Sequence, residues 1–300
     1  MDLLQLKYFQ KVAEIRHMTK ASQELHITQP ALSQTIAKLE KDIGGVPLFN
    51  REGRQIRLNQ YGEAFLKKVN IALNALEEGR REVDDLAGLQ QGRVSLDTTF
   101  IPPHFPNVIN QFTEKYPDIN FDISHASSQE EKENLLVNGE IDFCITCHPI
   151  DYKGYHNVPI QREDIVLVVP KTHRFASMTT LELSEAAKEP FISFKKKQPF
   201  RETVENLCLK AGFKPNIICE TDDYQIINNL VASKLGISIV PKSLVEKSKL
   251  TTVVHIKNPI SERIYYLSWK DDRYLSLAAQ QFRELLIEHY TQLNVSNVED

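Results

Sequence analysis

Apolar residues recur at helical spacing through the first forty residues of the chain. Positions three and four apart share one face of an α-helix, so a run of such spacings predicts a helix with one buried face. The residues on the inward face of the first predicted helix are Leu4, Tyr8, Phe9, Val12 and Ala13. The N-terminal segment therefore resolves into short helices.

Two further short helices follow, joined by a three-residue turn from His26 to Thr28. The first is expected to begin at Thr19 as its N-cap, and its inward residues are Ala21, Ser22 and Leu25. The second begins with Thr28, Gln29 and Pro30, and its inward residues are Ala31, Leu32, Ile36 and Leu39. Two helices joined in this way, over about residues 18–37, predict a helix-turn-helix whose second helix enters the DNA major groove.

The outward face of that second helix is Gln29, Ser33, Gln34 and Lys38, with no carboxylate before Glu40. Amide and hydroxyl groups form hydrogen bonds with base edges, a lysine reaches phosphate, and a carboxylate would repel the duplex. The alternative is a small helical bundle whose amide face is only solvated.

A short hairpin is predicted next, with a turn at Glu52–Gly53 between Leu48–Phe49 and Ile56–Leu58. Its arginines are Arg51, Arg54 and Arg57. Arginine suits phosphates or a narrow minor groove, so this hairpin has the character of a DNA-binding wing.

A heptad pattern runs through residues 62–90, where apolar positions alternate spacings of four and three. These positions are Phe65, Val69, Ala72, Leu76, Gly79, Val83 and Leu86, and Gly79 is the weak one. Such a seam predicts a dimer-forming helix, which at about 28 residues spans roughly 40 Å. The alternative is an amphipathic helix that packs on its own domain.

Strands and helices alternate from Gly92 onward, in two consecutive βαβα runs joined by long apolar strands. The pattern predicts a pair of open α/β subdomains, closed at the C-terminus by the amphipathic segment "SLAAQQFRELLIEHY". Sheets of this kind bind ligands outside the carboxyl ends of their strands, here expected to face each other across a cleft. The fold class is therefore multidomain, α followed by α/β.

Composition restricts the class of protein. With 41% apolar and 25% charged residues the chain is expected to be globular, and it holds no run of about 18 apolar residues that would span a membrane. Residues 1–62 carry nine Lys/Arg against six Asp/Glu and the rest carries 27 against 34, so a basic head precedes an acidic body. That asymmetry suits a polyanion bound at one end. The four cysteines and the absence of an export signal predict a reducing cytoplasm.

The segment "FQKVAEIRHMTKASQELHITQPALSQTIAKLEKDIGGVPLFNREGRQIRLNQYGEAFL" resembles the winged helix-turn-helix of LysR-type transcriptional regulators. The shared pieces are "QPALSQTIAKLE", the "LF.R" that enters the wing and the "RL...G" that leaves it, and the resemblance extends more loosely over the whole chain. Gln34 stands where the family often has arginine, and Asn59 where threonine is common. These departures bear on which bases are read.

The resemblance implies a domain plan and a set of partners. Residues 1–60 would bind DNA, 61–90 would form the linker helix that pairs antiparallel with its partner, and 91–300 would bind an effector. The last part would resemble periplasmic substrate-binding proteins, with subdomain I at about 91–162 and 267–300 and subdomain II at about 163–266. A homodimer or homotetramer would bind double-stranded DNA with an approximate inverted repeat and contact RNA polymerase. The DNA-binding candidates are Thr19, Thr28, Gln29, Pro30, Ser33, Gln34, Lys38, Arg51 and Arg57.

Effector-binding candidates lie in the turns after strands and at helix N-termini, where free backbone N–H groups suit an anionic ligand. They are Thr98, Thr99, Phe100 and Ser128 in the first subdomain, and Phe194, Phe200 and Tyr224 in the second. The alternative for each hydroxyl is a helix cap that meets no ligand. Asp97 replaces the family's usual glycine and would disfavour a carboxylate ligand. The run Lys195, Lys196, Lys197 with Arg201 lies near the expected mouth, and a solvated loop is the alternative there.

The cysteines give no metal site. Cys144 and Cys147 begin inside a predicted strand, where side chains three apart point to opposite faces, and no second pair follows. Peroxide-sensing members of the resembled family use two cysteines in the second subdomain. Cys208 matches one of those positions but Pro199 occupies the other, so Cys208 is expected to be a core residue.

Two classes of function remain. The first is a ligand-responsive transcription regulator without catalytic activity, cofactor or metal, and within it a regulator controlled by a partner protein stays open. The second is a solute-binding or catalytic α/β protein with an incidental helical N-terminus. The second would need an export signal or a catalytic motif such as a P-loop, G-x-S-x-G or H-E-x-x-H, and neither is found.

Overall fold

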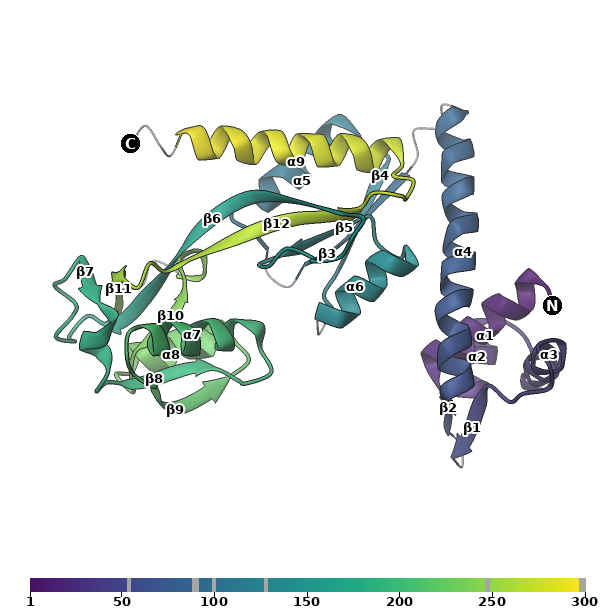
Figure 1. Cartoon of the computed structure of the whole chain (residues 1–300), viewed down its shortest axis with the longest axis horizontal. Coiled ribbons are helices and arrows are strands. Elements are labelled where there is room, and N and C mark those ends of the chain that lie inside the picture. Colours follow the sequence, from purple (N-terminus) through teal and green to yellow (C-terminus); the bar gives the residue numbers. More distant parts are fainter. Residues whose placement is uncertain (53–54, 88–91, 99–100, 127–128, 246–248, 297–300) are drawn as a thin grey trace. The chain divides into compact units, whose positions relative to one another are not determined.

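The computed structural model describes residues 1–52, 55–87, 92–98, 101–126, 129–245 and 249–296 (Figure 1). By its internal contacts the chain divides into two units. Unit 1 comprises Met1–Val158 and Leu267–Asp300, and unit 2 comprises Pro159–Tyr266. The sequence analysis placed the first boundary between the two subdomains after about residue 162, four residues later than the boundary between the units. Both boundaries between the units fall inside long strands.

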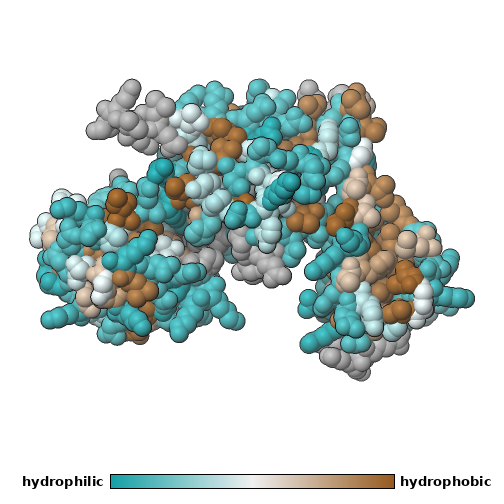
Figure 2. Space-filling model, in the orientation of Figure 1, coloured by the Kyte–Doolittle hydropathy of each residue, from teal (hydrophilic) through white to brown (hydrophobic). Residues whose placement is uncertain are grey.

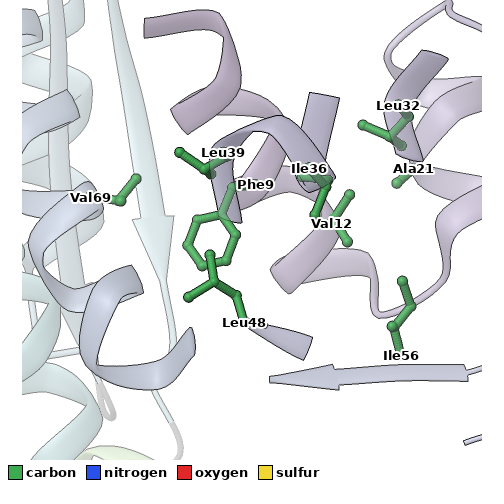
Figure 3. Close-up of a cluster of buried hydrophobic side chains, with 9 residues drawn as sticks. All are labelled: Phe9, Val12, Ala21, Leu32, Ile36, Leu39, Leu48, Ile56 and Val69. Carbon is green, nitrogen blue, oxygen red and sulfur yellow. The ribbon is translucent and has the colours of Figure 1, made fainter. Parts of the chain in front are cut away.

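The N-terminal part of unit 1 is a winged helix-turn-helix head followed by a long helix. Its elements are α1 (Leu3–Ile15), α2 (Met18–Glu24), α3 (Gln29–Asp42), β1 (Phe49–Glu52), β2 (Gln55–Leu58) and α4 (Gln60–Leu86). Figure 3 shows side chains from each of the four helices converging on one core, which Leu48 and Ile56 complete from the start of the wing and from β2. The strands of the wing pair antiparallel from Phe49↔Leu58 to Glu52↔Gln55.

Three details of the head differ from the sequence-based expectation. Leu4 is 56% exposed, and Gln5 is buried in its place because a capping box turns its side chain back to the backbone of Asp2. The N-cap of α2 is His17, whose ring nitrogen accepts from the Lys20 N–H, and not Thr19. Ala31 was expected to face the core and is exposed.

Helix α4 is fastened to the head at its first turn. The Asn59 side chain caps the helix by accepting from the N–H groups of Tyr61 and Gly62, both at 3.0 Å, and donates to the Pro47 carbonyl at 2.7 Å. Gly62 lies against the chain before the wing, where a Cβ would stand 2.1 Å from the Leu48 carbonyl oxygen. Only glycine permits this close approach.

Gly62→Ala is therefore expected to lower the free energy of unfolding by about 1–3 kcal/mol, as overpacking against backbone does. Gly79→Ala is the matched control in the same helix, because nothing lies within 4 Å of the Cβ it would add. Replacing glycine by alanine in an open helix interior stabilises it by up to about 1 kcal/mol. Urea denaturation of both variants checks the pair, and equal destabilisation would contradict the packing account.

The rest of unit 1 is built on three parallel strands of a larger mixed sheet, with helices on both faces (Figure 1). Its elements are β3 (Gly92–Thr98), α5 (Phe105–Lys115), β4 (Ile119–Ser124), α6 (Gln129–Asn138), β5 (Phe143–Thr146) and α9 (Leu277–Ser296). Strand β3 pairs in parallel with β4 on one side and β5 on the other. Edge-to-face contacts among Phe105, Phe112, Phe121 and Phe282 join α5, β4 and α9.

Unit 2 has a second α/β arrangement, and two long strands, β6 (Tyr155–Pro170) and β12 (Glu262–Lys270), connect it to unit 1. Its other elements are β7 (Thr180–Glu182), β8 (Pro190–Phe194), α7 (Pro199–Lys210), β9 (Asn216–Thr221), α8 (Tyr224–Ala232), β10 (Ser238–Pro241), β11 (Thr251–Asn258) and 3₁₀ turns at Leu183–Ala186 and Lys242–Leu244. Strands β10 and β11 pair antiparallel with β6, and β8 pairs in parallel with β9. The α plus α/β fold class is confirmed, whereas β7 and β11 lie outside the two βαβα runs that the sequence predicts.

Candidate DNA interface and effector site

Helix α3 presents the side chains expected to read DNA. Gln29, Pro30, Gln34 and Lys38 are exposed and Ser33 is half-buried, while Leu32, Ile36 and Leu39 face the core. The Gln29 side-chain amide donates to the Ser33 hydroxyl at 2.9 Å, one turn away. Thr28 caps the helix as expected, accepting from the Ala31 N–H at 3.4 Å. The helix therefore offers two amides and a lysine on one solvent-facing side.

Two small residues complete this face and were not among the candidates. Ala31 and Ala37 are exposed beside Gln34 and Lys38. A methyl group at a solvent-facing position of a recognition helix lets the duplex approach closely and can contact a thymine methyl. Alanine gives no sequence signal for this role, because an alanine in a helix more often indicates a buried position.

The carboxylates at the C-terminal end of α3 are engaged within the head. Glu40 accepts from the Leu48 N–H at 2.8 Å and so fixes the chain that leads into the wing. Asp42 binds the N-terminal ammonium of Met1 at 2.6 Å, and this hydrogen bond lowers the pKa of the Asp42 carboxyl. The exposed face of α3 therefore carries no carboxylate from Gln29 to Lys38, and Lys38 gives this end of the face a positive charge.

The wing is described in its strands but not at its tip. Arg57 is exposed on β2 and stands opposite Asn50 in the hairpin register. The side chain of Arg51 and the whole of Arg54 lie outside the described residues. Thr19 is exposed on the first turn of α2, where its carbonyl accepts from the Ser22 hydroxyl at 2.9 Å.

The predicted seam of α4 divides into two parts. Val69 is 2% exposed and belongs to the core of the head, and Phe65 packs against Phe9 with ring centroids 5.4 Å apart. These two residues therefore pack against the head of the same chain. Such packing is what the alternative, an amphipathic helix that packs on its own domain, predicts for the seam. Farther along, Leu76, Val83 and Leu86 are 59%, 63% and 83% exposed, and Ala72 is exposed with them. Figure 2 shows brown and tan side chains following this helix.

One effector candidate of unit 1, Thr98, is the last residue of β3 and is buried. The other three, Thr99, Phe100 and Ser128, lie outside the described residues. Asp97 is fully buried and ties β3 to the end of β4, accepting from the Ser124 hydroxyl at 2.9 Å and the Ala126 N–H at 2.6 Å. Its other oxygen lies 3.9 Å from the ammonium of Lys132, which is also buried. A carboxylate with a lysine counter-ion thus occupies the place expected for glycine.

The candidates of unit 2 are aromatic side chains around the start of α7 and α8. Phe194 and Phe200 are buried edge-to-face at 5.9 Å, and the Arg263 guanidinium lies 5.8 Å from the Phe200 ring. Tyr224 is half-buried at the start of α8. Phe194 is the last residue of β8, whereas Phe200 and Tyr224 lie in the first turns of α7 and α8, and Phe194 and Phe200 pack against each other.

The basic residues around the start of α7 lie in two different environments. Lys195, Lys196 and Lys197 are exposed, and Lys195 pairs with Asp222 at 2.5 Å. Arg201, expected with them near the mouth of the cleft, is buried: its guanidinium donates to the Phe194 carbonyl and to Glu220, both at 2.7 Å, and to Glu205 at 2.8 Å. Arg201 therefore holds β8, β9 and α7 together.

Burial sets the chemistry of two cysteines. Cys144 lies on β5 and Cys208 on α7, both fully buried, and desolvation raises the pKa of each thiol to about 12. Cys147 and Cys219 are half-buried. Within the described residues no group of three or more His, Cys, Asp or Glu side chains is arranged to hold a metal ion.

A thiol-reactive dye at pH 7.5 is therefore expected to leave Cys144 and Cys208 unmodified in the folded protein, because almost none of either thiol is ionised. All four cysteines should react after unfolding in guanidinium. Mass spectrometry of the labelled peptides identifies the sites, and rapid labelling of native Cys208 would contradict the burial argument.

None of the described helices has the length and apolar content that crossing a membrane requires.

Comparisons with known proteins match this architecture from end to end. Residues 3–63 match the family "Bacterial regulatory helix-turn-helix protein, lysR family", and residues 87–291 match "LysR substrate binding domain". The chain is 37% identical to the "Uncharacterized HTH-type transcriptional regulator YybE" of Bacillus subtilis (strain 168), covering 97% of this chain and 100% of that protein.

Solved structures share the fold. "Crystal structure of full-length CbnR complexed with the target DNA complex" superposes with a TM-score of 0.72 at 24% identity, over 96% of this chain and 99% of that one. "Effector binding domain of QuiR in complex with shikimate" superposes with a TM-score of 0.58 at 22% identity, over 67% and 98%. The chain belongs to the LysR family of transcriptional regulators, not to an enzyme family, and joins a DNA-binding helix-turn-helix to an effector-binding domain.

Proposed function

We propose that the protein binds a specific double-stranded DNA sequence as a homodimer or a homotetramer, and that a small molecule bound between its two α/β subdomains modulates transcription. The observation that carries the DNA-binding part is the exposed face of α3, which bears two glutamines and a lysine up to residue 38. Hydrogen-bonding amides on a solvent-facing recognition helix suit base edges, and the basic end suits phosphate. Contact with RNA polymerase would then link bound DNA to transcription in the cytoplasm.

The DNA-binding residues divide by role. Gln29, Ser33 and Gln34 would contact base edges, while Lys38, Thr19 and Thr28 would position the helix on phosphates. Pro30 sets the first turn of α3, and Arg51 and Arg57 would bind the backbone or the minor groove from the wing. Ala31 and Ala37 join the base-reading group.

Dimerisation would use the exposed apolar stripe of α4, formed by Ala72, Leu76, Val83 and Leu86. Exposed leucines and valines at heptad spacing gain free energy when a second helix covers them. A two-fold pair of heads then requires an operator with an approximate inverted repeat. Phe65 and Val69 support this helix from within the head.

The effector would contact Thr98, Thr99, Phe100 and Ser128 from one subdomain, and Tyr224 with Phe194 and Phe200 from the other. The buried Asp97 places a negative charge beside the expected ligand position, and the adjacent Lys132 offsets it. The pair favours a ligand with hydrogen-bond donors over a simple dicarboxylate, because a second carboxylate would lie close to Asp97.

Footprinting on the DNA that flanks the protein's own gene tests the proposal, at several salt concentrations and with a panel of small metabolites. A protected inverted repeat whose pattern changes with one compound is the expected result. Protection that no compound alters would keep DNA binding and favour control by a partner protein. If neither the DNA flanking the gene nor other genomic fragments showed specific protection, the proposed function would be contradicted.

A further inference from the structure

Helix α4 carries a polar face opposite its apolar stripe. Asn70, Asn74, Glu78, Arg81 and Asp85 follow each other at spacings of four, four, three and four. At 3.6 residues per turn this stripe lies roughly on the opposite side of the helix from Leu76 and Val83. Leu76 and Val83 on the apolar side are exposed. Each residue of the polar side instead has a partner in the regulatory part of unit 1, which comprises residues 92–158 and 267–296.

The contacts run along four turns of the helix. Asn70 and Asn74 donate to the Glu140 side chain at 3.3 Å and to the Asn138 carbonyl at 2.5 Å, at the end of α6. Glu78 pairs with Arg273, which also donates to the Leu136 carbonyl at 3.1 Å. Arg81 binds Asp142 at 3.1 Å, and Asp142 is almost fully buried.

Asp85 makes the last of these contacts and sits where its own helix disfavours it. A carboxylate in the final turn of a helix faces the negative end of the helix dipole. Asp85 instead accepts from the backbone N–H of Leu277, at the start of α9, at 2.8 Å and from the Tyr274 hydroxyl at 2.5 Å. A carboxylate at the N-terminus of a helix is favourable, so this position is explained by α9 and not by α4.

Asp142 extends the contact from α4 into the sheet. While one of its oxygens binds Arg81, the other accepts from both the N–H and the hydroxyl of Ser95, each at 2.8 Å. Ser95 lies in the middle of β3, two residues before Asp97 at the carboxyl end of the strand. One buried carboxylate thus joins Ser95 of β3 to the Arg81 guanidinium of α4 through charge-assisted hydrogen bonds.

We propose that the polar face of α4 is a docking surface for the regulatory part of the same chain, and that Arg81 acts through Asp142 and Ser95 to couple β3 to the linker helix. The contacts of these five residues are hydrogen bonds and ion pairs, which water can replace when opening exposes both partners to solvent. An apolar contact would lose far more on opening. The helix thus has one face suited to a permanent partner and one suited to a contact that opens and closes.

Hydrogen exchange on the full-length protein tests the docking contact. In Asp85→Asn the Leu277 amide is expected to exchange about tenfold faster, since it loses a bond to a charged acceptor. Asp84→Asn is the matched control, because Asp84 is the neighbouring carboxylate and pairs with Arg80 of its own helix. Equal exchange at Leu277 in the two variants and in the wild-type protein would overturn the docking surface.

The coupling is tested with a second pair, Arg81→Ala and Arg80→Ala. Arg80 is 74% exposed and is the matched control. Faster exchange at the Ser95 amide in Arg81→Ala alone is the expected result, and identical exchange in both variants would overturn the coupling. Circular dichroism establishes that each variant is folded.

The consequence for DNA rests on the proposed function and is measured separately. The footprint of Arg81→Ala is expected to differ in extent from that of wild type and Arg80→Ala on the same DNA. An unchanged footprint alongside faster exchange would show that the contact does not control the heads. If the wild-type protein itself gives no footprint, the proposed function fails while the exchange results still decide the contact.

Discussion

Leu76→Glu is expected to convert the protein into monomers and to weaken its binding to a two-half-site operator by about 10²–10⁴-fold. Leu76 is 59% exposed in the middle of the apolar stripe of α4, with Val83 two turns on. A glutamate there would have to lose its hydration when a partner helix covers it, and the apolar stripe itself offers no positive charge to compensate. Each head would then bind its half-site alone, without the effective concentration that pairing supplies.

Light scattering measures the mass of the variant, and a gel shift on the operator measures its affinity. Leu250→Glu serves as the matched control, because Leu250 is 62% exposed and belongs to unit 2. The control is expected to keep the mass of the wild-type protein. An unchanged mass for Leu76→Glu would remove the linker-helix dimer from the account.

Gln34→Ala and Lys38→Ala are expected to weaken DNA binding in different ways. Removing the Gln34 amide should cost about 1–3 kcal/mol of discrimination at one base pair of each half-site and leave binding to other sequences nearly unchanged. Removing the Lys38 ammonium should weaken all duplexes alike and reduce the salt slope by about one.

Titrations against the operator and a set of single-base variants, at three salt concentrations, separate the two effects. The variants control for each other, since both side chains are exposed on α3 and lie four residues apart. A uniform loss of affinity in both would show that α3 does not read bases at Gln34. A change of base preference in Lys38→Ala would exchange the two roles.

Much of this architecture could be predicted because the spacing of apolar residues in the sequence matches the helix faces on which they lie in the structure. Leu32, Ile36 and Leu39 recur at helical spacing and are buried, and Leu76, Val83 and Leu86 keep their heptad spacing on the exposed side of α4. Apolar spacing did not predict the outcome where one position fits two different packing roles. Val69 fits the seam and the core of the head equally well, and only the packing of α4 on the head decides between them.

Capping and polar contacts were harder to predict. His17 rather than Thr19 caps α2, because Arg16 adopts a left-handed backbone with φ 55° and the extended residue after it becomes the cap. Gln5 is polar, yet its capping box with Asp2 buries it. The partners of Arg81 and Asp85 lie more than 60 and more than 180 residues away in the sequence, so no local sequence pattern indicates these contacts.

The central claim is that two copies of α3, held by paired linker helices, read an inverted repeat. Selection of tight binders from a pool of random-sequence duplexes tests it most directly, because the selection itself reveals the preferred operator. We predict an enriched inverted repeat whose half-sites are separated by whole turns of the duplex, roughly 10 base pairs or a multiple. The motif selected by Gln34→Ala should be altered at matching positions of both halves. Enrichment of a single half-site, or of no motif at all, would contradict it.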